Sequence, residues 1–280
     1  MLERQLSTSQ QKFNDALRAR LEINRSLRAH EFLYGELIFR VDEQVFSPKL
    51  FAGWRYYTPL LSKIDLAGKR FLEIGCGCGI TGLYLAATQN IGQLVLTDIN
   101  PRAVSNAKHN AERLGLPTEI AFYESDVFDG IPASVFDLIY WNHPWEQEKT
   151  GYRHRDELEK GLFDGGYQAL GKFLKGLNDF LDPSGRALLG MGISADLHLF
   201  YGLCHEHGFH PYEVRDPQQK SASREYILYE IRKVTTTPPA IVWRMRIFKH
   251  QRLFILKAQA SRLIGRAMRL VQSNPFGRNK

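Results

Sequence analysis

The sequence predicts a doubly wound α/β fold built on a mostly parallel sheet. From Lys69 onwards, short apolar runs alternate with segments of helical periodicity, which is typical of strands joined by crossover helices. A glycine-rich turn, "GCGCG", joins the first of these apolar runs to the first helical segment. The 280 residues are 44% hydrophobic and 24% charged, which is the composition of a folded globular protein.

Residues 1–60 are expected to form a helical N-terminal cap. Apolar residues recur at roughly helical spacing from Leu17 to Leu27 among Arg, Glu and Gln, so we predict a helix over residues 1 to about 38. The stretch "LIFRVDEQVFSPKLF" then indicates a short strand and a loop that stops at Pro48.

Residues 61–232 are expected to form the core. Its first five strands are predicted, in chain order, in "KRFLEIG", "QLVLTDIN", "TEIAFYES", "FDLIYWN" and "RALLGMG". The intervening helices are predicted in "ITGLYLAATQN", "PRAVSNAKHNAERLG", the later part of "DELEKGLFDGGYQALGKFLKGLNDFL", and "ADLHLFYGLCHEHGF". The second helix has an N-cap in Asn100, proline at its first position and Gly115 at its end. "PYEVRD" and "EYILYEIRK" are expected to pair across a turn-rich segment and bring the sheet to seven strands.

The basic residues concentrate in a C-terminal extension, residues 233–280. From Arg232 to Lys280 there are twelve Lys or Arg and no acidic residue, although the whole chain carries only +7. In "QRLFILKAQASRLIGRAMRLV" the apolar residues fall on one helical face and the arginines on the opposite flank, which predicts a basic amphipathic helix. Through residues 240–272 this helix could cover a groove on the core, lie on an anionic membrane surface, or bind an acidic partner or nucleic acid.

Neither a membrane span nor a disulfide framework is indicated. No stretch reaches the roughly 18 apolar residues that a spanning helix needs, and the N-terminus lacks the apolar core of a signal peptide. We therefore expect a cytoplasmic protein, with a peripheral membrane contact left open. Cys76 and Cys78 are two apart and Cys204 is distant, so we expect reduced, buried thiols and no metal site.

The glycine turn and the acid after the next strand predict a nucleoside cofactor. Glycines 75, 77 and 79 let the backbone turn sharply and approach a ligand, and they are preceded by Glu73. Asp98 ends the next strand, where a carboxylate can accept both hydroxyls of a ribose. The dehydrogenase fingerprint G-x-G-x-x-G would need glycine at position 80, which is Ile80.

These motifs resemble a known family. "FLEIGCGCGITGLYLA", "LTDINPRAVSNAKHNAE" and "YESDVFDG" are similar to the first three motifs of the class I S-adenosylmethionine-dependent methyltransferases, with a Rossmann-like sheet. The resemblance covers about residues 45–232. It implies that S-adenosyl-L-methionine is the cofactor, with the glycines near its amino-acid part, Asp98 on the ribose and Asp126 on the adenine amino group. The cofactor-binding residues expected on this basis are Glu73, Gly75, Cys76, Gly77, Gly79, Asp98, Ile99, Asp126, Val127 and Asn142.

The corner "NHPW", residues 142–145, follows the fourth strand, where the carboxyl ends of a doubly wound sheet form the ligand crevice. Methyltransferases that act on planar nitrogens, such as those acting on release-factor glutamine or on amino groups of bases, carry Asn-Pro-Pro-Tyr there, and "NHPW" is similar. The catalytic residues expected are Asn142, His143, Pro144 and Trp145.

The residue types in this corner suit the transfer of a methyl group to a poorly nucleophilic nitrogen. The Asn142 side-chain oxygen and the backbone carbonyl of His143 could accept N–H groups of the acceptor, and Trp145 offers a flat face for stacking. His143 departs from the motif. It could act as a general base, which would favour a hydroxyl, carboxylate or amine acceptor, or it could point into solvent or cap a backbone group.

Two further segments are candidates for the substrate side. "VFSPKLF" loosely resembles the segment that closes over cofactor in release-factor methyltransferases, which brings in Phe46, Ser47 and Pro48. "TGYRHRDELEKGLFDGG", with Tyr152, Arg153, His154 and Arg155, is either a substrate loop or a solvated charged connection.

Together these observations predict a methyltransferase acting on a planar or amine nitrogen of a protein side chain or small molecule. The alternatives are a methyltransferase of nucleic-acid bases, an O-methyltransferase with His143 as base, and a membrane-associated scaffold that binds the cofactor without catalysis.

Overall fold

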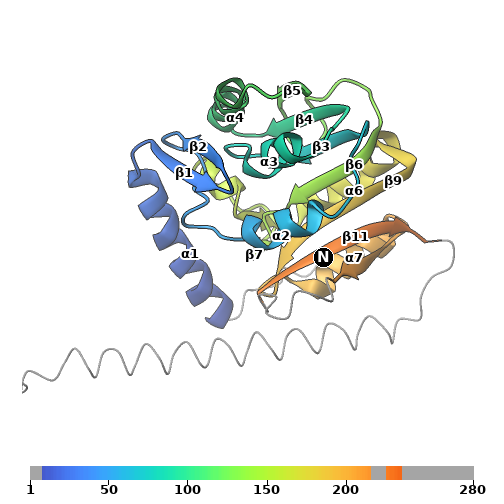
Figure 1. Ribbon diagram of the computed structural model, residues 1–280. Coiled ribbons are helices and arrows are strands. Elements are labelled where there is room, and N and C mark those ends of the chain that lie inside the picture. The colour runs from blue at the N-terminus through green and yellow to red at the C-terminus, as the bar shows by residue number, and fades with distance from the viewer. Residues whose placement is uncertain (1–7, 216–224, 235–280) are drawn as a thin grey trace, which may run out of the picture. The chain divides into compact units, whose positions relative to one another are not determined.

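A computed structural model describes residues 8–215 and 225–234 of the chain (Figure 1). Its main sheet has seven strands in the order β10-β11-β9-β6-β3-β4-β5. The strands are β3 (Arg70–Ile74), β4 (Gln93–Asp98), β5 (Glu119–Glu124), β6 (Phe136–Asn142), β9 (Leu181–Gly192), β10 (Phe209–Val214) and β11 (Tyr226–Lys233). All neighbours pair in parallel except β11, which is antiparallel to both β9 and β10. The predicted seven-stranded, mostly parallel sheet is confirmed.

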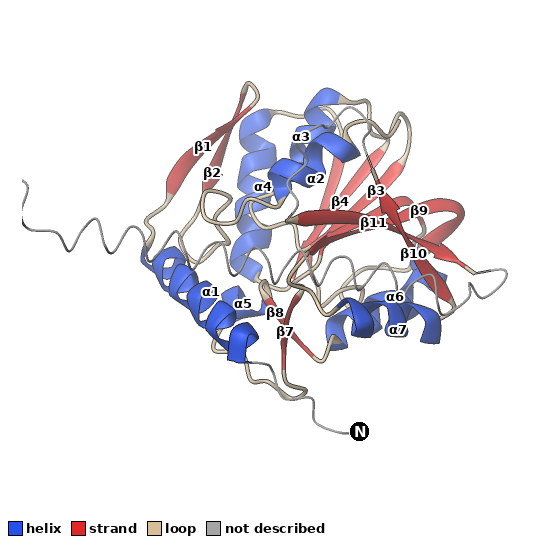
Figure 2. Cartoon of the chain, turned by 90° about the horizontal axis from the view of Figure 1, so that it is seen from below, coloured by secondary structure: helices blue, strands red, loops and turns tan. Residues whose placement is uncertain are grey.

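Helices cover both faces of this sheet, as a doubly wound fold requires (Figure 2). One layer holds α2 (Trp54–Leu61), α3 (Ile80–Thr88) and α4 (Pro101–Leu114), and the other holds α6 (Gln168–Phe180) and α7 (Leu197–Glu206). The predicted ends of α4 are confirmed. The Asn100 side chain accepts a hydrogen bond from the Arg102 N–H over 3.0 Å, and Gly115 ends the helix in the left-handed conformation.

The N-terminal segment is only partly the helix that was predicted. Helix α1 spans Thr8–Ser26, and a hairpin of β1 (His30–Tyr34) and β2 (Leu37–Val41) follows it. The predicted helix to residue 38 is therefore wrong beyond Ser26. Gly35 takes a φ of +59° in the tight turn, and the aromatic and β-branched residues around it favour strands.

Buried asparagines of α4 dock this hairpin on the core. Asn106 accepts a hydrogen bond from the Asp42 N–H over 3.0 Å and donates to the Arg40 carbonyl over 3.0 Å. Asn110 accepts from the Arg40 N–H over 2.8 Å and donates to the same carbonyl. The side-chain amides thus satisfy backbone groups of β2, because a carboxamide carries both a donor and an acceptor.

A second small sheet, not predicted from the sequence, lies against α1. It pairs β7 (Glu146–Glu148) with β8 (Phe163–Gly165), and the short helix α5 (Glu157–Lys160) lies between them. The apolar side chains of this contact are Leu17 and Leu21 from α1 with Leu158, Leu162 and Phe163. Arg25 also forms a bidentate ion pair with Asp156, with nitrogen–oxygen distances of 2.6 and 2.9 Å. The N-terminal helix is therefore fastened to the segment that follows the "NHPW" corner.

Three further expectations concern the cysteines, a membrane span and the basic C-terminal helix. All three cysteines are free thiols in buried positions, as predicted. Among the described residues, none of the helices combines the length and apolar character needed to cross a bilayer. The predicted basic helix at residues 240–272 lies outside the described residues.

Candidate active site

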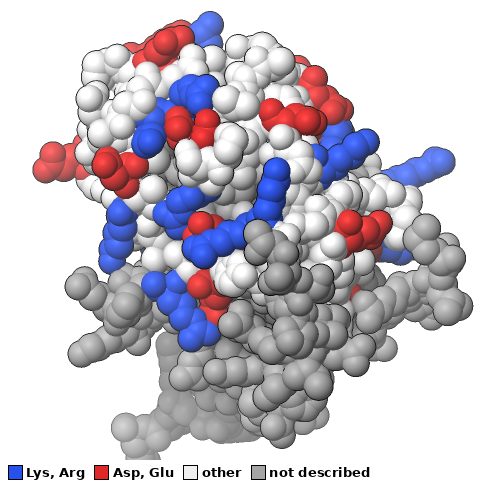
Figure 3. Space-filling model, turned by 90° about the vertical axis from the view of Figure 1, so that its right-hand side faces the viewer, with Lys and Arg blue, Asp and Glu red and all other residues white. Residues whose placement is uncertain are grey.

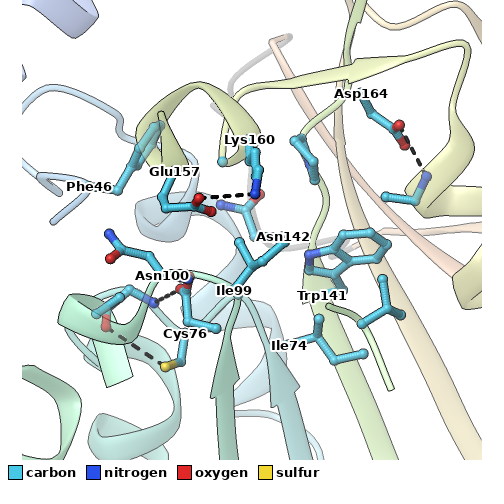
Figure 4. Close-up of a pocket in the computed structure, with 18 of the residues that line it drawn as sticks. Phe46, Ile74, Cys76, Ile99, Asn100, Trp141, Asn142, Glu157, Lys160 and Asp164 are labelled. Carbon is cyan, nitrogen blue, oxygen red and sulfur yellow. Dashed lines mark hydrogen bonds and ion pairs between the residues drawn. The ribbon is translucent and has the colours of Figure 1, made fainter. Parts of the chain in front are cut away.

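The carboxyl ends of four strands, β3, β4, β5 and β6, open on one cleft of about 450 Å³. β3 is central: Ile74 is the register partner of Thr97 on β4 and of Trp141 on β6. The ends of these parallel strands are therefore level, and the residues that follow them meet at one edge. Figure 4 shows Cys76 and Ile99 on one side of this cleft and Asn142 with Glu157 and Lys160 on another.

The glycine turn forms the floor between β3 and α3. Gly75, Gly77 and Gly79 have φ angles of +64°, +56° and +81°, a conformation that side-chain-bearing residues rarely adopt. A Cβ on Gly79 would lie 2.8 Å from a methyl group of Leu83, whereas a Cβ on Gly77 would meet nothing within 4 Å. Gly77 thus borders open space in the cleft, where its backbone can approach a ligand. Of the three, Gly75 and Gly77 line the cleft and Gly79 does not.

Glu73 lies beneath this turn. Its Oε2 accepts a hydrogen bond from the Gly82 N–H in α3 over 2.7 Å. Burial raises the pKa of Glu73 to about 8, and the nearby Asp98 carboxylate adds to the rise, whereas the Gly82 N–H opposes it. Glu73 lines the cleft and also fixes the first turn of α3 against β3.

Asp98 faces the glycine turn from the end of β4. Its Oδ2 accepts from the Gly77 N–H over 2.9 Å, and its Oδ1 accepts from the Asn100 N–H over 2.9 Å. Burial raises the pKa of Asp98 to about 6, against the effect of these two N–H groups. Each carboxylate oxygen keeps a further lone pair, so the group can still accept from a diol. Ile99 follows it in the cleft lining.

Asp126 and Val127 line the cleft after β5. Val127 has a φ of +59°, which is an outlier for a β-branched residue, and its carbonyl accepts a hydrogen bond from the Ser125 hydroxyl over 2.9 Å. Strain of this kind tends to gather at functional sites. The Asp126 side chain is half exposed and pairs with Lys172 of α6 over 2.7 Å. Its predicted role toward adenine stays a prediction.

Asn142 is the last residue of β6 and lines the cleft. Its side-chain oxygen is buried and has no hydrogen-bond partner among the described residues, and the Tyr140 hydroxyl below it is in the same state. A buried carboxamide oxygen without a partner is costly, so a site of this kind is expected to receive a donor. The atom that is left free is the one that the sequence assigns to clamping an acceptor.

The other three residues of the corner differ in whether they line the cleft. Pro144 lines the cleft, but His143 and Trp145 do not. The His143 side chain is fully buried, and its Nε2 lies 3.0 Å from Oδ2 of Asp164. The expectation that His143 points into solvent or caps a backbone group is therefore wrong.

Trp145 is held against the sheet. Its ring N–H donates to Glu146 over 2.9 Å, and its ring lies so close to Gly192 that a Cβ there would come within 2.3 Å of the indole nitrogen. Tyr226 packs against it edge-on, with ring centroids 6.1 Å apart. The geometry therefore matches packing, and the stacking role of Trp145 stays a prediction.

One wall of the cleft, which we propose faces the acceptor, comes mainly from the segment after the corner. The wall residues are Tyr152, His154, Glu157, Leu158, Lys160, Gly161, Phe163, Asp164 and Gly165. Tyr152 and His154 were candidates from sequence, as were Phe46 and Pro48, which also line the cleft, unlike Ser47. Glu157 and Lys160 were missed, because a salt-bridged pair three residues apart is the ordinary pattern of an exposed helix.

Comparison with known proteins agrees with this architecture. Residues 36–172 match the family model of the methyltransferase small domain. The fold resembles that of the protein SMU.776 solved in complex with S-adenosylhomocysteine, with a TM-score of 0.51 and 13% identity over 75% of this chain and 57% of that one.

The related sequences act on different acceptors. A Methanocaldococcus jannaschii protein, named provisionally as an N5-glutamine methyltransferase, is 34% identical over 45% of this chain and 63% of its own length. The ribosomal protein uL3 glutamine methyltransferase of Neisseria gonorrhoeae is 28% identical over 60% of this chain and 58% of its own. The ribosomal RNA small subunit methyltransferase C of Haemophilus influenzae is 37% identical over 35% of this chain and 30% of its own. The chain thus spans about three fifths or less of these relatives.

The fold, the cleft and the family match define the class. Residues 36–172, just under half of the chain, match a methyltransferase domain, and the cofactor of that class is S-adenosylmethionine. The residues of the cleft fit that cofactor: Asp98 is poised for a ribose, Gly77 borders open space, and Asn142 offers an unused acceptor where the methyl group would face a substrate.

Proposed function

We propose that the chain transfers a methyl group from S-adenosylmethionine to the side-chain amide nitrogen of a glutamine in a protein. Asn142 lines the cleft that holds the glycine turn and Asp98, and the observation that carries this proposal is its buried side-chain oxygen, which has no hydrogen-bond partner among the described residues. Two relatives whose names specify glutamine methylation support the choice of acceptor.

The cofactor side is held by the residues described above. Asp98 accepts the ribose hydroxyls, the backbone of Gly75 and Gly77 approaches the amino-acid part, and Asp126 meets the adenine. When bound, S-adenosylmethionine supplies an electrophilic methyl group on a sulfonium and leaves as S-adenosylhomocysteine. The level ends of β3, β4 and β6 bring Asn142 to the same edge of the sheet as the glycine turn and Asp98.

The acceptor side has to compensate for a weak nucleophile. The lone pair of an amide nitrogen is delocalised, and positive charge develops on the nitrogen as the new bond forms. The Asn142 oxygen accepts an N–H of the acceptor, which stabilises that charge and aims the lone pair at the methyl group. The nitrogen then loses its proton, so no strong base is needed. We retain the backbone carbonyl of His143 as the proposed second acceptor.

O-methylation with His143 as general base finds no support in the geometry. The imidazole is fully buried and does not line the cleft: its Nε2 is engaged by Asp164, and its Nδ1, which has no partner among the described residues, is buried as well. A base has to reach the proton that it abstracts within hydrogen-bond distance, or through one water. We therefore do not pursue this alternative.

Mass spectrometry tests the proposal directly. The purified protein is incubated with methyl-labelled S-adenosylmethionine and an extract of cells that lack this protein, and labelled peptides are sequenced. We expect label on a glutamine side chain. Label confined to RNA, or to another side chain, would replace the proposed acceptor.

A nucleic-acid base remains the second candidate, since the ribosomal RNA methyltransferase match favours it. The charge of the core does not: residues 1–231 hold 25 basic and 30 acidic groups. On the face that Figure 3 shows, acidic and basic side chains of the described residues are interspersed. If RNA is the acceptor, its affinity for the full chain should fall steeply with salt. The scaffold alternative predicts cofactor binding and liposome flotation that depends on residues 240–280, without label transfer.

A further inference from the structure

The corner that presents Asn142 is held from behind by the N-terminal end of α6. We infer that Asp164, through His143, and Tyr167 are positioning residues that fix the direction of the Asn142 side chain. The inference rests on the proposed function, since it concerns the residue that would clamp the acceptor nitrogen.

The first tie is the buried pair of His143 and Asp164. Asp164 Oδ2 lies 3.0 Å from His143 Nε2, and both side chains are almost fully excluded from solvent. The same carboxylate accepts the N–H groups of Ala169 and Leu170 over 3.1 and 3.0 Å. These N–H groups belong to the first turn of α6, which would otherwise lack acceptors. Asp164 thus joins the imidazole rigidly to a helix.

The second tie reaches the corner at Trp145, two residues beyond His143. The Tyr167 hydroxyl donates to the Trp145 carbonyl over 2.7 Å and accepts from the Asp196 N–H over 2.9 Å. Tyr167 is almost completely buried, and its ring packs edge-on against that of His143, with centroids 5.3 Å apart. The corner is therefore anchored at residues 143 and 145 to the same end of α6.

The side-chain oxygen of Asn142 has no comparable hydrogen bond within the described part of the chain. Its backbone is in register with Gly190 on β9, but it precedes His143 rather than a proline, so the steric restriction of a pre-proline residue falls on His143. Its amide oxygen has no partner among the described residues that could fix its orientation. The direction of that oxygen consequently depends on where the backbone of the corner is held.

The arrangement also explains why a histidine occupies a position behind the cleft. A side chain that only filled space between Trp141 and Tyr167 could be apolar, whereas the imidazole provides an N–H for Asp164 as well as an edge-on ring. Removing the donor while keeping a ring should leave the fold in place and loosen the corner.

The test uses the full chain with His143→Phe, His143→Gln, Asp164→Asn and the His143→Phe/Asp164→Asn double variant. Asp179→Asn, an exposed change on α6, is the matched control. S-adenosylhomocysteine affinity is measured by calorimetry, methyl transfer into protein of the cell extract by label, and the Asn142 side-chain amide by NMR, with its signal assigned through its loss in Asn142→Ala.

We expect His143→Phe to bind S-adenosylhomocysteine like the wild type, to transfer methyl groups roughly 10- to 100-fold more slowly, and to shift or broaden the Asn142 signal. His143→Gln keeps a donor for Asp164 and should recover most of the rate. The double variant should be no slower than the slower single variant, because the two residues act as one unit.

Wild-type transfer and an unchanged Asn142 signal in His143→Phe would overturn the inference, as would multiplicative losses in the double variant. If His143→Phe does not fold, His143→Gln and Asp164→Asn decide by the same comparison. If the wild type itself transfers no label, the proposed function fails, while the NMR comparison still decides whether the pair positions Asn142.

Discussion

The Asp98 carboxylate accepts a hydrogen bond from the Gly77 N–H over 2.9 Å, although the two residues are 21 positions apart. This bond joins the turn after β3 to the end of β4 and makes one wall of the cleft out of two sequence motifs. The second carboxylate oxygen is held by the Asn100 N–H, so the group has a fixed orientation before any ligand arrives.

Replacing Asp98 should weaken cofactor binding. Asp98→Ala removes an acceptor that would make two hydrogen bonds to a ribose, each worth about 1.5–3 kcal/mol for a charged group. We expect the affinity for S-adenosylhomocysteine to fall by at least roughly 100-fold in calorimetry. The matched control, Asp179→Ala on the exposed side of α6, should bind like the wild type. Equal affinities of Asp98→Ala and the wild type would remove the ribose assignment.

The buried Glu73 should make the stability of the ligand-free protein depend on pH. Its pKa rises from 4.5 to about 8 on folding, so the folded state binds the proton more tightly than the unfolded state. The stabilising contribution is complete below the unfolded pKa and is lost as the pH rises through the folded one. It should therefore fall by up to roughly 1.4 kcal/mol per pH unit between these values.

Glu73→Gln isolates this effect, because glutamine resembles the protonated acid and can still accept from the Gly82 N–H. Urea unfolding at pH 5 to 8 should show the wild type losing stability relative to Glu73→Gln as the pH rises. Parallel pH profiles of the two proteins would mean that Glu73 is ionised throughout the range.

The ion pair of Arg25 should stabilise the acceptor-side wall. Arg25→Ala removes two hydrogen bonds to Asp156, and we expect the free energy of unfolding to fall by about 1–3 kcal/mol. Hydrogen exchange in residues 146–165 should become faster. Arg28→Ala is the control, because that side chain is 89% exposed and should cost less than about 0.5 kcal/mol.

The same pair has a defined pH dependence. The Arg25 guanidinium lowers the pKa of the Asp156 carboxyl, so its stabilisation is present above the ordinary pKa and is lost as the pH falls through the lowered value. The difference between wild type and Arg25→Ala should therefore shrink in acid. A difference that persists unchanged below that range would show that packing, not charge, holds the wall.

The sheet and its helices could be predicted because their signals are local. Buried strand runs such as that of β3, and caps such as Asn100 and Gly115, are written in adjacent residues. Strand β1 was missed, because Leu17 to Leu27 set a helical period that was extended too far, whereas β2 lies in the stretch where a short strand was predicted. Docking by Asn106 and Asn110, more than 60 residues away, leaves no mark in the hairpin's own sequence.

The residues at the strand ends of the site were likewise predictable, whereas the surroundings of His143 were not. Glu73, Gly77, Asp98 and Asn142 were all expected and all line the cleft. The environment of His143 could not be foreseen, since its partner Asp164 lies in a second small sheet that packs against the distant helix α1. Short strands of three residues carry too little pattern to be recognised.

The central claim is that Asn142 acts on the acceptor and not on the cofactor. Its most direct test compares Asn142→Ala with the wild type in two measurements: calorimetric affinity for S-adenosylhomocysteine and the rate of label transfer into protein of the cell extract. The account predicts similar affinity and a loss of transfer of at least roughly 100-fold. Transfer at the wild-type rate would contradict it.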